Sequence, residues 1–194
     1  MMALSETSTM FLALLSGLIA HLAVFRRGEW DASSPSILKF YFFSFILVSF
    51  PLHVRVGIAV SGILKLASCH AIGLFTSILV YRAWFHRLSA YPGPFLARLT
   101  NFYITTLSMK KLHLYDEVQK LHARFGDYVR LGPRELSITD PKAVRAIYGS
   151  QSATTKGPWY TLLEPRVPLF MARDKQEHAK RRRVWDQGFN TSGR

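Results

Sequence analysis

The chain has 194 residues, of which 49% are hydrophobic, and it carries a formal net charge of +13. This length leaves room for one modest domain and a further segment. The single cysteine, Cys69, excludes a disulfide framework within the chain and a cysteine-rich zinc site.

The positive charge is concentrated in the second half of the sequence. Residues 91–194 hold 18 of the 25 lysines and arginines but only nine acids. A basic soluble part favours a partner or ligand of negative charge. Nucleic acid, anionic lipid, an acidic protein and the carboxylates of a cofactor all satisfy that requirement, and composition does not choose among them.

Three apolar stretches precede Tyr91, and each is close to the roughly 17–25 helical residues that cross a bilayer core. The second stretch is the least regular, because it contains Lys39 and Pro51. We predict a helical membrane anchor over residues 1–90 with three spans, at about residues 10–25, 37–54 and 61–81.

The flanking arginines predict the orientation of this anchor. With three spans and the N-terminus outside, the outer loop holds Arg55 alone, whereas the inner segments hold Arg26, Arg27, Arg82 and Arg87. The positive-inside rule then places residues 82–194 in the cytosol. The alternative for the first stretch is a cleaved secretory signal, but the N-terminus carries Glu6 in place of a basic region.

A short proline-rich segment separates the anchor from the remainder. Pro92-Gly93-Pro94 restricts the backbone on both sides of a glycine, so residues 91–94 are predicted to form a stiff hinge. The alternative is an ordinary turn, and both interpretations are compatible.

Residues 95–194 alternate between helical and extended patterns. Apolar residues recur at helical spacing over residues 111–125, and two short strands, 128–131 and 135–138, flank a tight turn. A helix over residues 141–148 and a long loop over residues 150–173 follow, and Asp174 with Glu177 predicts the start of a last helix. Because an isolated hairpin is marginally stable, we expect this ribbon to need further strands.

The last helix carries the candidate site. His178, Arg182, Trp185 and Phe189 are spaced by four, three and four residues, which places them on one face. An arginine beside two aromatic rings suits the carboxylate of a flat apolar ligand. The alternative is a basic helix with buried aromatics and solvated cations. Nucleic-acid binding by the basic run at residues 180–183 is disfavoured, because the sequence contains no nucleic-acid-binding fold.

The segment from Tyr91 to Phe189 resembles the N-terminal part of a microsomal cytochrome P450, especially the fungal enzymes of secondary metabolism. The residues that carry the resemblance are "YPGP", "LHARFGDYVRLGPRELSITDPKAVRAIYG", "KGPWY" and "EHAKRRRVWDQGF". The resemblance implies the incomplete N-terminal part of a mainly α cytochrome P450 fold (α+β, with a two-stranded ribbon) over residues 95–194, ending in the C helix.

The resemblance also implies a function. The parent activity is the oxidation or hydroxylation of a small organic substrate by a haem monooxygenase of the endoplasmic reticulum membrane, with an NADPH-dependent P450 reductase as partner. His178 and Arg182 match the positions on the C helix at which the family binds the haem propionates.

The sequence departs from the family pattern in lacking the axial cysteine that activates oxygen on haem. Cys69 does not replace it, because it precedes the hinge and lies in the third apolar stretch. We therefore expect a truncated chain that is inactive as given, with no catalytic residue, no metal ligand and no stably bound haem. The alternatives are a small non-catalytic membrane adaptor with a basic cytosolic tail, or a fragment of an active monooxygenase.

Overall fold

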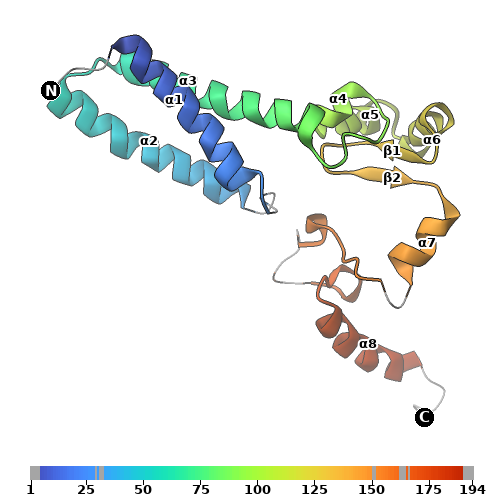
Figure 1. Cartoon of the computed structure of the whole chain (residues 1–194). Helices are drawn as coiled ribbons and strands as arrows, with labels where there is room; N and C mark the ends of the chain where they lie inside the picture. Colours follow the sequence, from blue (N-terminus) through green and yellow to red (C-terminus); the bar gives the residue numbers. More distant parts are fainter. Residues whose placement is uncertain are drawn as a thin grey trace. The chain divides into compact units, whose positions relative to one another are not determined.

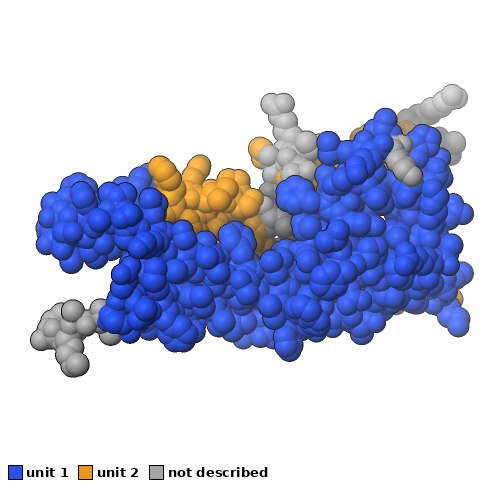
Figure 2. Space-filling model, turned by 90° about the horizontal axis from the view of Figure 1, so that it is seen from above, with its two compact units in different colours: residues 1–27, 43–144 blue, residues 28–42, 145–194 orange. Residues whose placement is uncertain are grey.

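The computed structural model describes residues 5–28, 30, 33–149, 152–161, 165 and 167–189. The chain divides into two compact units, shown in different colours in Figure 2. The first comprises residues 1–27 and 43–144, and the second comprises residues 28–42 and 145–194.

Among the described residues, three helices are long and apolar enough to cross a membrane. Helix α1 (Glu6–Ala20) continues into the π-helical turn η1 (His21–Phe25), and α3 (Val60–Val80) continues into η2 (Tyr81–Phe85). Helix α2 (Ser34–Val56) is the third, and it retains Pro51 within its length. Each apolar stretch predicted from the sequence lies within one of these helices.

Helices α1 and α3 lie side by side (Figure 1) because two glycines allow their backbones to approach. A Cβ atom on Gly17 would lie 2.0 Å from the carbonyl oxygen of His70, and one on Gly73 would lie 2.1 Å from that of Leu14. No side chain fits at either position without separating the helices.

Polar side chains also join the two helices. Ser16 Oγ and His70 Nδ1 are 2.8 Å apart, and His21 Nδ1 and Ser77 Oγ are 2.7 Å apart. Each bond joins one position on α1 or η1 to one position on α3, so together they fix one register between the helices.

The predicted ribbon is confirmed. Strands β1 (Tyr128–Arg130) and β2 (Leu136–Ile138) are antiparallel, with Val129 opposite Ser137. Whether the ribbon is completed by further strands stays a prediction, but within this chain β1 is already covered while β2 is half-buried. Val129 and Arg130 have no exposed surface, because α6 packs on β1 and the backbone N–H of Arg130 donates to the Pro92 carbonyl over 2.8 Å.

The predicted helix over residues 111–125 begins too early. Helix α5 (Phe102–Lys111) is followed by the C-cap residue Leu112, whose φ of 53° is left-handed. A separate helix, α6 (Leu114–Phe125), begins two residues later. Helices α5 and α4 (Phe95–Leu99) were not predicted.

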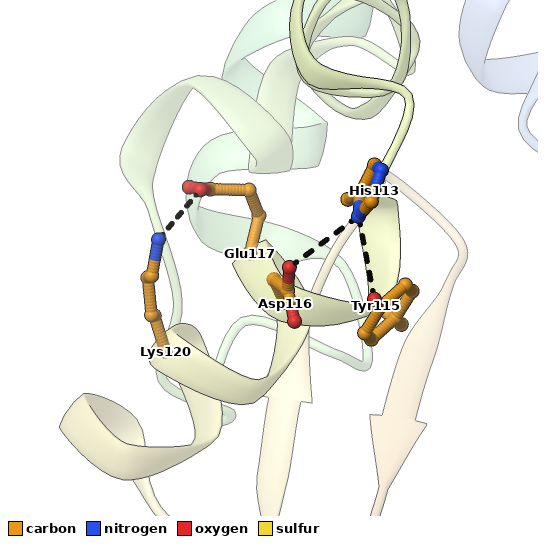
Figure 3. A network of polar contacts seen from close by, with 5 residues as sticks. All are labelled: His113, Tyr115, Asp116, Glu117 and Lys120. Atoms are coloured by element: carbon orange, nitrogen blue, oxygen red, sulfur yellow. Dashed lines mark hydrogen bonds and ion pairs between the residues drawn. The ribbon is translucent and has the colours of Figure 1, made fainter.

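Charged side chains support the start of α6 (Figure 3), where the side chain of the N-cap residue His113 caps no backbone N–H. Asp116 and Glu117 place negative charge near the positive end of the helix dipole. His113 Nδ1 lies 3.8 Å from the Asp116 carboxylate, and Lys120 Nζ donates to Glu117 over 2.9 Å. These contacts organise the first turn of α6, and their exposed members make them weak contributors to stability.

The remaining elements follow the predicted order with one correction. Helix α7 (Pro141–Tyr148) is confirmed, and the Asp140 carboxylate accepts from the backbone N–H of Lys142 over 2.9 Å. The segment predicted as a loop over residues 150–173 contains two single-turn 3-10 helices, η3 (Pro158–Thr161) and η4 (Leu169–Met171). Residues 150, 151, 162–164 and 166 of that segment lie outside the described residues. The last helix is α8 (Lys175–Phe189).

Candidate functional site

Helix α8 carries the predicted site residues, and Asp174 sets its start. The Asp174 carboxylate accepts from the backbone N–H of Glu177 over 2.7 Å, which is half of the predicted capping box. The Glu177 carboxylate pairs instead with Arg181, whose Nε donates over 2.8 Å. The helix dipole and the cap therefore fix the first turn that bears His178.

The two aromatic residues of the predicted face stack on each other. The rings of Trp185 and Phe189 have centroids 6.0 Å apart and an interplanar angle of 11°. Trp185 is 56% exposed and Phe189 is 78% exposed. The interpretation of these rings as core of the present chain is therefore wrong, and they form an open apolar surface on unit 2.

Arg182 and His178 lie one turn apart on the same face of α8. The Arg182 side chain has a partner on its own helix, because its Nε donates to Asp186 Oδ1 over 2.7 Å. Sequence reasoning missed Asp186, although its spacing of four residues from Arg182 is the signal of a helical ion pair. Both side chains are at least half exposed, so this pair contributes only about 0.3–0.5 kcal/mol.

The arrangement therefore leaves the Arg182 guanidinium able to exchange its partner. A propionate at the edge of a flat apolar macrocycle would find a guanidinium for its carboxylate and two rings for its apolar face. The residues of α8 fit the periphery of a haem. They do not supply an iron ligand of sulfur type, and Cys69 lies half-buried on α3 in the other unit.

The loop before α8 is held to the base of that helix within unit 2. Arg173 Nε donates to the Lys156 carbonyl over 2.9 Å, and Arg181 Nη1 donates to the Val167 carbonyl over 2.7 Å. The Lys156 ammonium lies 5.5 Å from the centroid of the Tyr160 ring, and that ring meets Trp159 edge to face. These contacts place the predicted "KGPWY" stretch and α8 in one body.

A second group of functional interest lies where the third apolar helix meets the hinge. The buried Arg130 guanidinium donates to the carbonyls of Gly132 over 3.2 Å and Pro133 over 2.7 Å. Arg98 Nη2 reaches the Tyr91 carbonyl at 3.4 Å, and Arg82 Nη1 donates to the Leu99 carbonyl over 2.9 Å. Within unit 1, Arg82 thus joins η2 to the end of α4, Arg98 joins α4 to the hinge segment, and Arg130 closes the turn of the β-ribbon.

His86 stays neutral beside this cationic group. Burial and the positive charge of Arg130, followed by those of other arginines, lower the pKa of His86 to about 4. Its Nδ1 accepts a hydrogen bond from the backbone N–H of Leu88 over 3.1 Å, which requires the neutral ring.

We expect His86 to destabilise the folded chain as the pH falls from 6.5 to about 4. In this window the unfolded chain binds the proton and the folded chain does not, so acid favours unfolding, by up to about 3 kcal/mol. His86→Asn keeps a hydrogen-bond acceptor but does not titrate in this window. The melting temperature of the detergent-solubilised chain should therefore depend less on pH between 6.5 and about 4 in this variant. Equal profiles for wild type and His86→Asn would contradict the assignment.

Comparison with known proteins finds relatives that match most of this chain. The chain is 58% identical over 136 residues to the cytochrome P450 monooxygenase orf5 of Eupenicillium brefeldianum, covering 70% of this chain and 28% of that protein. It is 46% identical over 182 residues to the cytochrome P450 monooxygenase FCK2 of Fusarium pseudograminearum, covering 90% of this chain and 33% of that protein. The chain is homologous to fungal cytochrome P450 monooxygenases over about a third of their length.

A third P450 relative carries a more specific name. The tryprostatin B 6-hydroxylase of Aspergillus fumigatus is 32% identical over 183 residues, which cover 90% of this chain and 33% of the hydroxylase. Matches of this extent necessarily include residues of the first 90 and the ribbon. No family model and no solved structure matches the chain. The resemblance drawn from the sequence is therefore confirmed, and a mainly helical chain with a two-stranded ribbon agrees with P450 homology.

Proposed function

We propose that this chain supplies the membrane anchor and the propionate-binding helix of a haem monooxygenase. The observation that carries the proposal is its 46% identity to a P450 monooxygenase over 90% of the chain. The parent reaction is the oxidation or hydroxylation of a small organic compound, of the secondary-metabolite class. Haem, when bound, supplies the oxygen activation. Its axial thiolate comes from a segment of the family's proteins that this chain does not span.

The anchor comprises residues 1–90, and the segment 91–94 acts as the hinge to residues 95–194. The three apolar helices support this assignment by their length and composition. With the N-terminus outside, the flanking arginines place residues 82–194 on the cytosolic side of the endoplasmic reticulum membrane. A protease-protection assay on microsomes tests this topology. We expect a protected N-terminus and an accessible α8, and the opposite result would contradict the proposed orientation.

Within the haem domain, Arg182 holds a propionate and His178 holds it from the preceding turn. The exchangeable pair of Arg182 with Asp186 supports the first role, and the shared helix face supports the second. Trp185 and Phe189 cover the apolar edge of the macrocycle and exclude water there. The exposed cations beside this face, Lys180, Arg181 and Arg183, offer a surface for an acidic NADPH-dependent reductase.

The test is a chimera in which this chain replaces the matching third of the Fusarium relative. We expect the chimera to retain haem and the carbon monoxide difference spectrum of a thiolate-ligated haem. Arg182→Ala removes a charge-assisted hydrogen bond and should weaken haem retention about tenfold or more. His178→Ala should also weaken it.

Arg183→Ala is the matched control, because it removes an equal charge from the same helix outside the predicted face. Equal haem retention in the Arg182→Ala and Arg183→Ala chimeras would exclude the propionate role. A chimera that folds in the membrane without binding haem would contradict the proposed function as a whole.

A second candidate function is favoured by the exposed basic run of α8. A chain that binds a reductase without catalysing a reaction would act as a membrane adaptor. Capture of a P450 reductase by the isolated chain, lost on neutralising residues 180–183, would support this function. Digestion of residues 95–194 by mild protease would count against it, because such a tail would not persist as a folded partner.

A further inference from the structure

The paired helices α1 and α3 enclose an apolar groove that the proposed monooxygenase function does not use. It has a volume of about 680 Å³. Leu14, Leu18 and Leu22 recur every four residues along one wall, and Ile72, Thr76 and Val80 do so along the other. Four-residue spacing aligns each set along its helix, so the groove runs lengthwise between the two helices. A linear apolar chain matches this shape better than a globular side chain does.

The groove has a cationic end. Arg26 continues the leucine stripe of α1 by one further turn and lines the same groove. Its guanidinium lies 5.2 Å from the centroid of the Tyr81 ring, which also lines the groove. Arg26 is exposed, so its donors can reach a ligand from outside. An apolar channel that ends on a guanidinium is complementary to a fatty chain carrying a phosphate.

We propose that this groove binds one anionic glycerophospholipid, with an acyl chain between α1 and α3 and the phosphate on Arg26. The inference rests on the membrane anchoring proposed above. Under the proposed orientation, Arg26 lies at the cytosolic surface, where anionic lipids are concentrated and basic pockets between membrane helices bind their head groups. A guanidinium binds phosphate through two parallel hydrogen bonds, which gives the site its preference for a lipid over a hydrocarbon.

The glycines of the crossing explain why the groove exists. Because Gly17 and Gly73 bring the backbones together, the larger side chains on either side of the contact stand apart and leave a channel. Thr76 and Ser77 line the channel as well, so its walls are not uniformly apolar. The Ser77 Oγ lies 2.7 Å from His21 Nδ1, so this hydroxyl already has a hydrogen-bond partner within the protein.

The site is tested with the full chain in bilayer nanodiscs of equimolar phosphatidylcholine and phosphatidylserine. Lipids that remain bound after release from the disc are counted and identified by native mass spectrometry. We expect one retained phosphatidylserine in preference to phosphatidylcholine. Arg26→Gln should lower this retention about fivefold, the effect expected of one arginine at an anionic membrane surface.

Arg27→Gln is the matched control. It removes the same charge from the adjacent residue, which does not line the groove. A general attraction of anionic lipid to the basic end of α1 would be weakened equally by both variants, and that result would overturn the proposal.

A photoactivatable p-benzoylphenylalanine at Thr76 identifies the occupant directly. A lipid adduct supports the inference, whereas a cross-link to α2 or to a second copy of the chain would overturn it. Extraction of the chain from microsomes by alkaline carbonate would show that the anchoring itself is wrong. Retention in the membrane without a phosphatidylserine preference would reject the lipid site alone.

Discussion

Replacing Gly17 and Gly73 together by alanine should separate α1 from α3 and leave the solubilised chain prone to aggregation. Each added methyl group would lie about 2 Å from a backbone carbonyl oxygen of the facing helix, so the helices must move apart. Overpacking of this kind costs about 1–3 kcal/mol at each position. The separation also breaks the bonds Ser16–His70 and His21–Ser77, which contribute about 0.6 kcal/mol each in an apolar surrounding.

The measurement is the temperature at which half of the detergent-solubilised chain is lost from the monodisperse peak in size-exclusion chromatography. We expect the double variant to lose stability well beyond either single variant. Gly62→Ala is the control on α3, because its added Cβ would meet only the end of the Ile58 side chain at 3.2 Å. Unchanged melting of the double variant would show that the helices do not pair at these glycines.

Composition and periodicity predict most of the elements but little of how they are joined. The three apolar helices, the ribbon and helix α7 follow from patterns that are local in the sequence. The break at Leu112 does not, because a leucine with a left-handed φ has no sequence signature. A single amphipathic pattern therefore concealed the boundary between α5 and α6.

The contacts that matter most are also the least predictable. Ser16 and His70 are 54 residues apart in the sequence. The backbone N–H of Arg130 donates to the carbonyl of a hinge residue, Pro92. Nothing local to either partner selects the other, so only the folded chain shows these pairs. The candidate site was easier to predict from the sequence. His178, Arg182 and the two aromatic residues lie on one helix, so their spacing alone places them on one face. What the spacing did not show was the competition of Asp186 for Arg182.

Gly93→Ala should release the hinge from the ribbon. Gly93 has a φ of +154°, and a Cβ atom there would lie 2.5 Å from the Arg130 carbonyl oxygen and 3.1 Å from its nitrogen. The backbone N–H of Arg130 donates to the Pro92 carbonyl over 2.8 Å, so β1 cannot move away from the hinge without losing this hydrogen bond. The backbone strain alone costs about 1–3 kcal/mol, and the lost hydrogen bond leaves the buried N–H of Arg130 unsatisfied.

We expect the variant to expose the hinge to protease and to accelerate amide exchange at Arg130 while the apolar helices stay intact. Gly157→Ala is the matched control, because an added Cβ there meets nothing within 4 Å. Limited proteolysis followed by mass spectrometry locates the cut. Cleavage within residues 91–94 in Gly93→Ala alone would show that the close approach of the hinge to β1 holds these two segments together. The stiffness of the two prolines would then not be enough. Equal protection in both variants would mean that the prolines suffice.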